Sequence, residues 1–304
     1  MPELPEVETV RSGLAKSITD ATVTGIKIHE ERSLKKHLSG VRDFRQKLLG
    51  TKVLDVVRRG KFLWLPLEGE ATALVGHLGM SGQMLIRTPG YPQDKLNRVT
   101  IEFETKTGKP LELRFVDQRI FGSLAIDDLV KTRDGGSGGF SSGKNSSKPW
   151  QNLIPVSAEH IARDPLDDAF DLAAVVSKMR NKKSGIKRVI LDQNLLSGIG
   201  NIYADESLWL AKLHFDRSAD GISKSKLTEL LEISKQVLQA AVVQGGTSFD
   251  QQYKNVNGEA GYFSQQLYAY GQTDKPCARC HTPIRRQAWA NRGSHFCPRC
   301  QRPS

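Results

Sequence analysis

Apolar residues near the start of the chain recur at intervals of three and four positions, which places them on one face of a helix. They are Val7, Val10, Leu14 and Ile18. We therefore expect an amphipathic helix over about residues 5–18, and Pro5 suits its first turn because that position needs no backbone N–H donor. Pro2 and Glu3 would lie directly before this helix.

Between about residues 22 and 126 the pattern changes to short β-rich runs, separated by glycine, proline and charged turns. The clearest runs are 22–28, 53–58, 62–67, 71–78, 99–103 and 111–116. Runs of this length and spacing predict a β-sandwich.

Residues 133–149 are rich in glycine and serine, and Phe140 is their one large apolar residue. This composition predicts a flexible linker or surface insertion that buries almost nothing. Beyond it the pattern becomes helical, at 170–181, 186–193, 203–213 and 223–243. Residues 245–270 show no sustained period, and a loop of that length is usually functional or disordered.

The length of 304 residues favours two or three domains. Lysine and arginine number 44 against 33 acidic residues, a net charge of +11, so a polyanion such as nucleic acid is the expected partner. With 38% hydrophobic residues and no apolar run near ~18 residues, we expect a soluble globular protein without a membrane span. The acidic residues at the start are not typical of a signal peptide.

All four cysteines lie near the C-terminus, as the pairs Cys277-x2-Cys280 and Cys297-x2-Cys300. Each pair supplies two thiolates to one tetrahedral ion, and the residues between the pairs are long enough for a β-hairpin. The pattern favours one Zn²⁺ over iron, and four thiolates close the coordination sphere, so the zinc would be structural. Cysteines confined to such a site suit a reducing cytosol.

The N-terminus carries candidate chemistry. Removal of Met1 would leave the secondary amine of Pro2, and such α-amino groups are less basic than lysine, so part of it is neutral at pH 7. That amine could attack a sugar carbon and form an iminium, with Glu3 and Glu6 beside it for acid–base work. The alternative is that these residues only begin a helix.

Three further turns carry bulky or basic side chains. The run from Arg58 to Lys61 would point Lys61 into a cleft, unless it is a solvated hairpin tip. Met80, Arg119 and Phe121 stand on glycine-bounded turns. They would be wedges inserted between bases, unless the methionine and the phenylalanine belong to the core. Two glycines in 197–201 precede a helix, where backbone amides can face an anion.

Together these segments resemble the formamidopyrimidine-DNA glycosylase family, bacterial repair enzymes that excise oxidised purines. The resemblance covers essentially the whole chain apart from residues 133–149. The matching motifs are MPELPEVET at 1–9, RRGKFL at 58–63, HLGMSG at 77–82, DQRIFG at 117–122, GIGNIYADE at 198–206, GYFSQ at 261–265 and the terminal four-cysteine ribbon.

The resemblance implies catalytic roles position by position. Pro2 would be the nucleophile, Glu3 the acid that protonates the opened sugar, and Glu6 the support of that pair. Lys61 would be the proton donor of β-elimination, and Arg292 that of δ-elimination at the tip of the ribbon.

The resemblance also implies DNA contacts. Three side chains would fill the gap left by the extruded nucleotide: Met80, Arg119 and Phe121. Lys182 and Asn201 would contact phosphates from a helix–two-turn–helix domain. Tyr262 would belong to a mobile loop, residues 251–262, over the flipped base.

The sequence departs from the family pattern at a few positions. Leu96 stands where relatives often have a DNA-contacting histidine, and Arg98 is close enough to compensate. Gln118 replaces a frequent proline. None of these positions belongs to the expected chemistry.

The expected fold is multidomain α+β: a β-sandwich with an N-terminal helix, a helix–two-turn–helix domain and a four-cysteine zinc ribbon. The expected divisions are 1–132 (catalytic domain), 133–149 (linker or insertion), 150–245 (helical domain), 246–272 (lesion-capping loop and connector) and 273–304 (ribbon). The chain would be a DNA glycosylase and AP lyase that removes 8-oxoguanine and formamidopyrimidines through a Pro2 Schiff base. Strand cleavage would follow by β,δ-elimination.

Its partner would be double-stranded DNA with oxidised bases. The protein would be a monomer and would act in the cytoplasm at the nucleoid. Two alternatives stay open. One is an endonuclease VIII-like glycosylase for oxidised pyrimidines, and the other is a zinc-ribbon DNA binder without catalysis. Leu4 and the GYF-bearing loop favour the purine enzyme, and Pro2, Glu3, Lys61 and Arg292 together argue against the binder.

Overall fold

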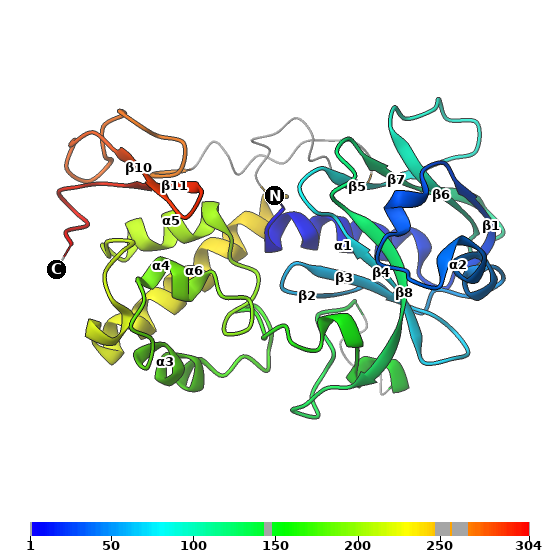
Figure 1. Ribbon diagram of the computed structural model, residues 1–304, viewed down its shortest axis with the longest axis horizontal. Helices are drawn as coiled ribbons and strands as arrows, with labels where there is room; N and C mark the ends of the chain where they lie inside the picture. The colour runs from blue at the N-terminus through cyan, green and yellow to red at the C-terminus, as the bar shows by residue number, and fades with distance from the viewer. Residues whose placement is uncertain (1, 143–147, 247–255, 257–266, 304) are drawn as a thin grey trace. The chain divides into compact units, whose positions relative to one another are not determined.

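A computed structural model describes residues 2–142, 148–246, 256 and 267–303. They form two compact units (Figure 1). The first takes residues 2–160 and the described part of 245–261, and the second takes residues 161–244 and the described part of 262–304. Among these described residues, no helix is both long enough and apolar enough to span a bilayer.

Two antiparallel sheets build the first unit, as the β-rich pattern predicted. A four-stranded sheet has the order β1-β6-β7-β5 and a five-stranded sheet the order β2-β3-β4-β8-β9. The strands are β1 (Thr22–Ile28), β2 (Val57–Arg59), β3 (Phe62–Pro66), β4 (Thr72–His77), β5 (Gly82–Arg87), β6 (Asn97–Glu104), β7 (Pro110–Asp117), β8 (Ser123–Lys131) and β9 (Leu153–Pro155).

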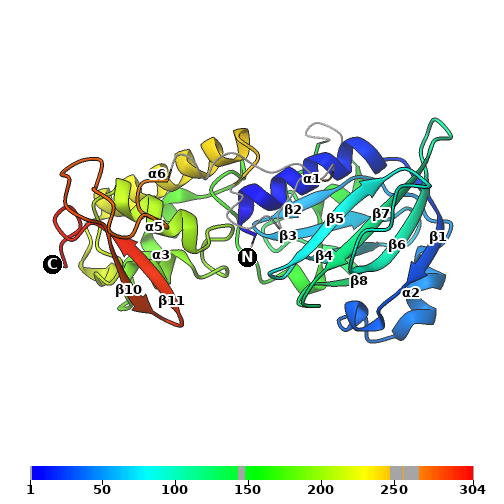
Figure 2. The ribbon, with the colours of Figure 1, turned by 90° about the horizontal axis from the view of Figure 1, so that it is seen from above.

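Apolar side chains of both sheets and of helix α1 (Leu4–Ile18) form one core. The predicted face of α1 is buried in it. The helix contacts β2 and β5, which are edge strands of different sheets, and so covers the core between two sheet edges (Figure 2). The residues that precede α1 are therefore carried by a rigid, buried element.

Helix α2 (Gly40–Leu48) interrupts the region that the sequence predicts as strands only. Phe44 and Leu48 are its buried side chains, one turn apart on an otherwise charged helix. Two apolar positions are too few to produce a periodic signal, so the sequence pattern did not reveal this helix. Short 3-10 turns complete the chain: η1 (Glu31–Leu34), η2 (Pro149–Asn152), η3 (Val156–Ala158) and η4 (Ala219–Gly221).

The glycine- and serine-rich stretch is not a free linker where the structure describes it. Gly138 and Ser141 are buried, and Phe140 forms an antiparallel bridge with Arg58 of β2. The expectation that this stretch buries almost nothing is therefore wrong for residues 138–141. Its glycines permit close packing, which composition alone cannot distinguish from flexibility.

The second unit combines four helices with a β-hairpin. The helices are α3 (Leu172–Arg180), α4 (Ile186–Ile190), α5 (Asn201–Leu210) and α6 (Lys224–Val243), close to the predicted spans. The hairpin consists of β10 (Arg285–Trp289) and β11 (Arg292–Phe296). Ala290 and Asn291 join its strands with φ values of 43° and 61°, as a tight two-residue turn requires.

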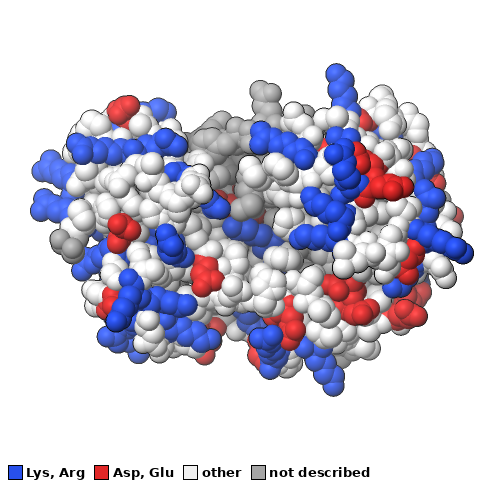
Figure 3. Space-filling view, viewed as in Figure 1, with Lys and Arg blue, Asp and Glu red and all other residues white. Residues whose placement is uncertain are grey.

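Charge is distributed widely over the surface. Lysine and arginine side chains are spread over the face shown in Figure 3, with aspartate and glutamate among them. The net charge of +11 is therefore not gathered into one basic stripe on this face.

Candidate active site

The start of α1 brings Pro2, Glu3 and Glu6 together, and all three are buried. The backbone N–H of Glu3 donates to Oε2 of Glu6 at 2.8 Å, which satisfies a donor that the start of a helix leaves unpaired. Gly246 lies against the same carboxylate, because a Cβ there would be 2.8 Å from Oε1 of Glu6. Glu6 therefore fixes the backbone at Glu3, directly after Pro2.

Lys61 lies in the turn between β2 and β3, where Gly60 has a φ of 56°. Behind this turn the side chain of Arg58 is 1% exposed. Its Nε donates to Glu8 Oε2 at 3.0 Å and its guanidinium donates to the Gly60 carbonyl at 3.1 Å. Glu8 also pairs with Arg11 at 2.9 Å. A buried charge network thus joins α1 to the turn that carries Lys61.

Met80 and Phe121 are 46% and 47% exposed, so neither belongs to the core. The turns that carry them meet through their backbones. A Cβ at Gly79, whose φ is 61°, would lie 2.7 Å from the amide nitrogen of Gly122. The two turns therefore form one surface with two exposed apolar side chains.

The carboxylate of Asp117 holds these turns together. Its Oδ1 accepts hydrogen bonds from Ser81 Oγ at 2.5 Å and from the Arg119 N–H at 3.1 Å. Its Oδ2 accepts from the Gly122 N–H at 2.7 Å. With every oxygen of this carboxylate engaged, the backbone of Arg119 has a defined conformation.

Leu96 and Arg98 both contact the start of the 117–122 turn. Leu96 is 45% exposed with a φ of 62°, and its carbonyl accepts from the Asp117 N–H at 3.2 Å. Arg98 Nε donates to the Asp117 carbonyl at 2.8 Å. Arg98 therefore supports the turn itself, and its predicted contact with DNA stays a prediction.

Two residues behind the turns have structural roles that the sequence analysis did not assign, although His77 begins the HLGMSG motif. Lys35 Nζ donates to the carbonyl of Ile120, whose φ is 55°, at 2.6 Å. His77 ends β4 just before the Met80 turn, and burial lowers its pKa to about 4, with Lys36 and Lys35 adding to the shift. His77 is therefore neutral at pH 7, and no spacing in the sequence indicates either role.

In the second unit, Asn201 is the first residue of α5 and Lys182 follows α3. Asn201 Nδ2 donates to the carbonyl of Gly293 at 3.1 Å, next to Arg292 in the hairpin. Lys182 is about half exposed, with its Nζ 4.0 Å from Asp192. The structure thus ties Asn201 to the hairpin, whereas Lys182 and Arg292 present their charges to solvent.

A buried lysine links α4, α5 and the hairpin. Lys187 has a fully buried side chain whose Nζ lies 2.6 Å from Asp205 Oδ1 and donates to Ser294 Oγ at 2.8 Å. Asp205 Oδ2 accepts from the backbone N–H of His295 at 2.9 Å. This network fixes the strand that begins at Arg292. Sequence reasoning missed it because a lysine near other basic residues is normally exposed.

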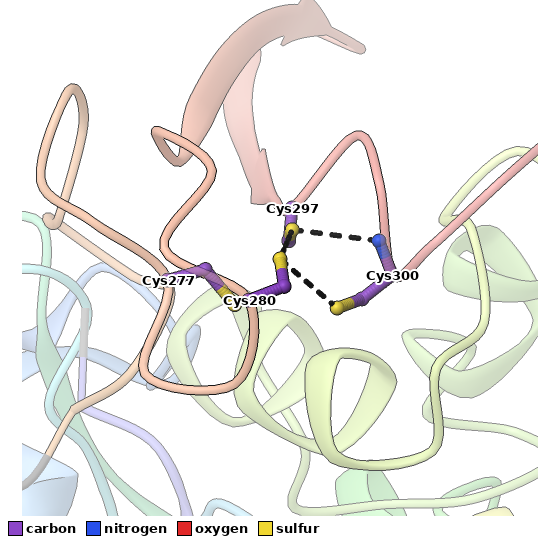
Figure 4. Close-up of side chains that lie close together, drawn as sticks. All are labelled: Cys277, Cys280, Cys297 and Cys300. Atoms are coloured by element: carbon purple, nitrogen blue, oxygen red, sulfur yellow. Dashed lines mark hydrogen bonds between the residues drawn. The ribbon is translucent and has the colours of Figure 1, made fainter.

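The four cysteines converge at the base of the hairpin (Figure 4). Their Sγ atoms all lie within 4.8 Å of one another, and Cys280 Sγ is 3.4 Å from Sγ of both Cys297 and Cys300. Thiolates at Zn–S bonds of about 2.3 Å are spaced at similar distances, so the residues fit one zinc ion. Hydrogen bonds from Thr282 lower the pKa of Cys280 to about 6, which favours a thiolate.

One predicted site residue, Tyr262, lies outside the described residues, as does the loop 251–262 apart from Val256. The structure brings Pro2, Glu3 and Glu6 together at one helix end and Met80, Arg119 and Phe121 on one surface. It also reveals two buried networks, one with Glu8 and Arg58 and the other with Lys187 and Asp205.

Comparison with known protein families assigns three parts of the chain. The formamidopyrimidine-DNA glycosylase N-terminal domain matches residues 1–124 and the H2TH domain of the same enzyme matches residues 161–252. A zinc finger found in FPG and IleRS matches residues 274–303.

Proteins that match over the whole chain have the same name as these domain families. Formamidopyrimidine-DNA glycosylase of Leifsonia xyli subsp. xyli is 50% identical over 99% of this chain and 100% of its own length. The enzyme of Rhodococcus opacus is 49% identical over 99% of this chain and 97% of its own. A mutant of Lactococcus lactis FPG, solved in complex with Fapy-dG-containing DNA, has a TM-score of 0.81 and 31% identity, covering 99% and 100% of the two chains.

Proposed function

Because this chain belongs to the formamidopyrimidine-DNA glycosylase family, we propose that Pro2, Glu3 and Lys61 carry out its chemistry on damaged DNA. The enzyme is a DNA glycosylase that removes oxidised purines and an AP lyase that then cuts the strand. Its partner is double-stranded DNA that contains the damaged base.

The observation that carries the proposed site is the buried path from α1 to the β2–β3 turn. Glu8 of α1 binds Arg58, and Arg58 binds the Gly60 carbonyl next to Lys61. This path supports a single reaction centre, because it couples the element that carries Pro2 to the turn that carries Lys61.

The reaction starts with extrusion of the damaged nucleotide, since a base inside the duplex cannot be reached by the amine. Extrusion costs a few kcal/mol. Met80, Arg119 and Phe121 offset this cost by filling the vacated space, and their shared surface supports that role. Tyr262 contacts the flipped base.

Pro2 then attacks C1′ of the nucleotide through its neutral amine. A bond forms between the nitrogen and C1′, and the bond from C1′ to the base breaks, so that the base leaves with its electron pair and takes up the proton that the amine loses. Glu3 protonates the ring oxygen as the sugar opens, which leaves an iminium between Pro2 and C1′. Glu6 maintains the geometry by capping α1.

The iminium acidifies the C2′–H bond. Loss of that proton expels the 3′ phosphate, with Lys61 as proton donor, and this is the β-elimination. A second proton loss expels the 5′ phosphate in the δ-elimination, with Arg292 as donor. No step consumes a redox or nucleotide cofactor.

The other parts of the chain bind DNA. Lys182, Asn201 and Arg98 contact phosphates, so affinity falls steeply with salt. Zinc, once bound, holds the ribbon in its folded form and supplies no chemistry at C1′. The functional divisions are the catalytic, helical and ribbon regions expected from the sequence, except that residues 150–160 go with the catalytic region, because β9 belongs to its five-stranded sheet. The enzyme works as a monomer in the cytoplasm at the nucleoid.

A nicking assay tests this function. We expect the protein to cut an 8-oxoguanine:cytosine duplex and to leave phosphates at both ends of the gap, as β,δ-elimination requires. Cleavage of a thymine glycol duplex at a higher kcat/KM would instead assign the enzyme to oxidised pyrimidines. Binding without any cleavage would make it a DNA-binding protein only.

A further inference from the structure

The segment between β8 and β9 is built into the first unit. Thr132 donates from Oγ1 to the Gly136 carbonyl at 2.7 Å. The N–H of Gly138 donates to the carbonyl of Gln151 at 2.6 Å, just before β9. These bonds hold the described part of the segment against the strand that ends the five-stranded sheet.

Two residues further on, the same segment reaches the opposite edge of that sheet. The N–H of Phe140 donates to the Arg58 carbonyl at 2.7 Å, and the Arg58 N–H donates back to the Phe140 carbonyl at 3.0 Å. Because β2 and β9 are the two edge strands, residues 138–140 join both edges of one sheet.

The glycines of this segment are required by close approach. A Cβ at Gly138 would lie 1.9 Å from the Leu153 carbonyl oxygen. A Cβ at Gly139 would lie 2.4 Å from the carbonyl oxygen of Arg58. No side chain fits at either distance, so the segment is shaped to pass between these backbones.

Side chains of the segment contact the buried charge network. The Arg11 and Arg58 guanidinium carbons lie 5.1 and 5.7 Å from the centre of the Phe140 ring. Arg11 also donates to Ser142 Oγ at 3.0 Å. Both arginines bind Glu8, so the phenylalanine covers the point where α1 and β2 are joined.

We propose that residues 137–142, the bridging segment, are a positioning element for the lyase step, with Phe140 as its principal residue. The proposal rests on the proposed roles of Pro2 and Lys61. The segment pairs with the short strand β2 and contacts both arginines of the Glu8 network. It thereby fixes the turn of Lys61 with respect to the helix that starts after Pro2.

This position predicts which step depends on the segment. Base excision uses the amine of Pro2 and the carboxyl of Glu3, both carried by α1. The β-elimination needs Lys61 at its correct distance as well. A loosened β2 should therefore slow strand cleavage more than base excision, whereas general unfolding would slow both equally.

The test compares Phe140→Ala with wild type in single-turnover assays. Base excision is read from an 8-oxoguanine duplex after hot alkali, and cleavage from a duplex with a preformed abasic site without alkali. We expect cleavage to fall by about tenfold or more and excision by less than about threefold, since displacements near 1 Å can cost up to a hundredfold. Equal losses in both assays, or none, would overturn the proposal.

Three variants make the result specific. Phe140→Tyr keeps the ring and should restore the wild-type ratio of the two rates. Arg133→Ala removes an exposed ion pair of 2.9 Å with Glu159 in the same stretch and should leave both rates unchanged. If Phe140→Ala does not fold, Ser142→Ala removes only the bond to Arg11 and should lower the ratio about two- to tenfold, a loss typical of a single hydrogen bond. An unchanged ratio in Ser142→Ala would refute the proposal in that case.

Two outcomes separate this proposal from others. A Phe140→Ala protein with wild-type rate ratio but weakened duplex binding would show that the segment contacts DNA instead of positioning Lys61. A wild-type protein that neither excises nor cleaves would refute the proposed function itself, whereas an active wild type with an insensitive ratio refutes only the positioning role.

Discussion

The two units each carry a proposed proton donor on a hairpin but support those hairpins differently. In the first unit the Lys61 turn stands on a sheet whose core includes side chains of two sheets and a helix. In the second, the residues on either side of the Arg292 hairpin, Ile284 and Cys297, belong to a small cluster with Trp209, Ala269 and Cys277. Each hairpin also has a buried ion pair behind it, Arg58 with Glu8 and Lys187 with Asp205.

This difference teaches what each hairpin depends on. A large apolar core tolerates the loss of one polar contact, because most of the stabilisation lies elsewhere. A ribbon with few buried apolar side chains cannot fold on its own and needs a metal or another cross-link. We therefore expect changes at the cysteines and Lys187 to exceed those at polar positions of the first unit.

The largest effect should follow loss of the metal. Cys297→Ser removes one of four thiolates, and structural zinc binding is worth about 10 kcal/mol or more. We expect the zinc content to fall, the hairpin to unfold, and duplex affinity to drop by about tenfold or more as its charge-assisted contacts are lost. Metal analysis and titration with labelled duplex measure both. Wild-type protein treated with a chelator should lose duplex affinity as the Cys297→Ser variant does. Full duplex affinity in protein shown to be metal-free would contradict this account.

The next effect concerns the buried lysine. Lys187→Met removes the lysine partner of Asp205 in a buried site, where His295 Nδ1 at 3.1 Å is its remaining ion-pair partner, and this costs about 3–5 kcal/mol. Lys226→Met is the matched control. Lys226 also forms an ion pair, with Glu229 at 2.9 Å, but on the exposed surface of a helix. Its loss should cost less than about 1 kcal/mol. Urea unfolding measures the loss of unfolding free energy in each variant. Equal losses in the two variants would show that Lys187 contributes no more to stability than an exposed ion pair does.

The smallest effect is a pH dependence in the first unit. Burial lowers the pKa of His77 from 6.5 to about 4, so below pH 6.5 the unfolded chain binds a proton that the folded chain excludes. Stability from this group is therefore fully present above pH 6.5 and is lost as the pH falls toward 4. We expect a loss of about 1 kcal/mol between pH 7 and pH 5, after discounting for partial exposure.

His77→Gln isolates this contribution because it removes the titrating group from the same position. Its unfolding free energy should change less between pH 7 and pH 5 than that of the wild type. Parallel curves for the two proteins would mean that His77 is not held neutral.

Much of the fold could be predicted because its signals are periodic. The apolar spacing of α1 and α6, the alternating runs of the sheets and the paired cysteines each repeat at intervals that physics fixes. Two of the predicted wedge side chains, Met80 and Phe121, are about half exposed, as that role requires.

What could not be predicted depends on contacts between distant residues. Nothing in the spacing of Arg58 reveals that it meets Glu8, fifty positions earlier. From the sequence alone Lys187 would be assigned to the surface, and its buried ion pair with Asp205 is seen only in the structure. Gly138 and Gly139 look like part of a flexible linker, although they are there because two backbones pass too close for any side chain.

The central claim is that Pro2 is the nucleophile, and trapping of the reaction intermediate tests it most directly. Borohydride added during reaction with an 8-oxoguanine duplex should reduce the iminium to a stable protein–DNA adduct, and peptide mapping should place that adduct on the nitrogen of Pro2. An N-terminal extension converts the amine to an amide, so it should abolish trapping while duplex binding persists. An adduct mapped to Lys61 with none at Pro2 would contradict the account.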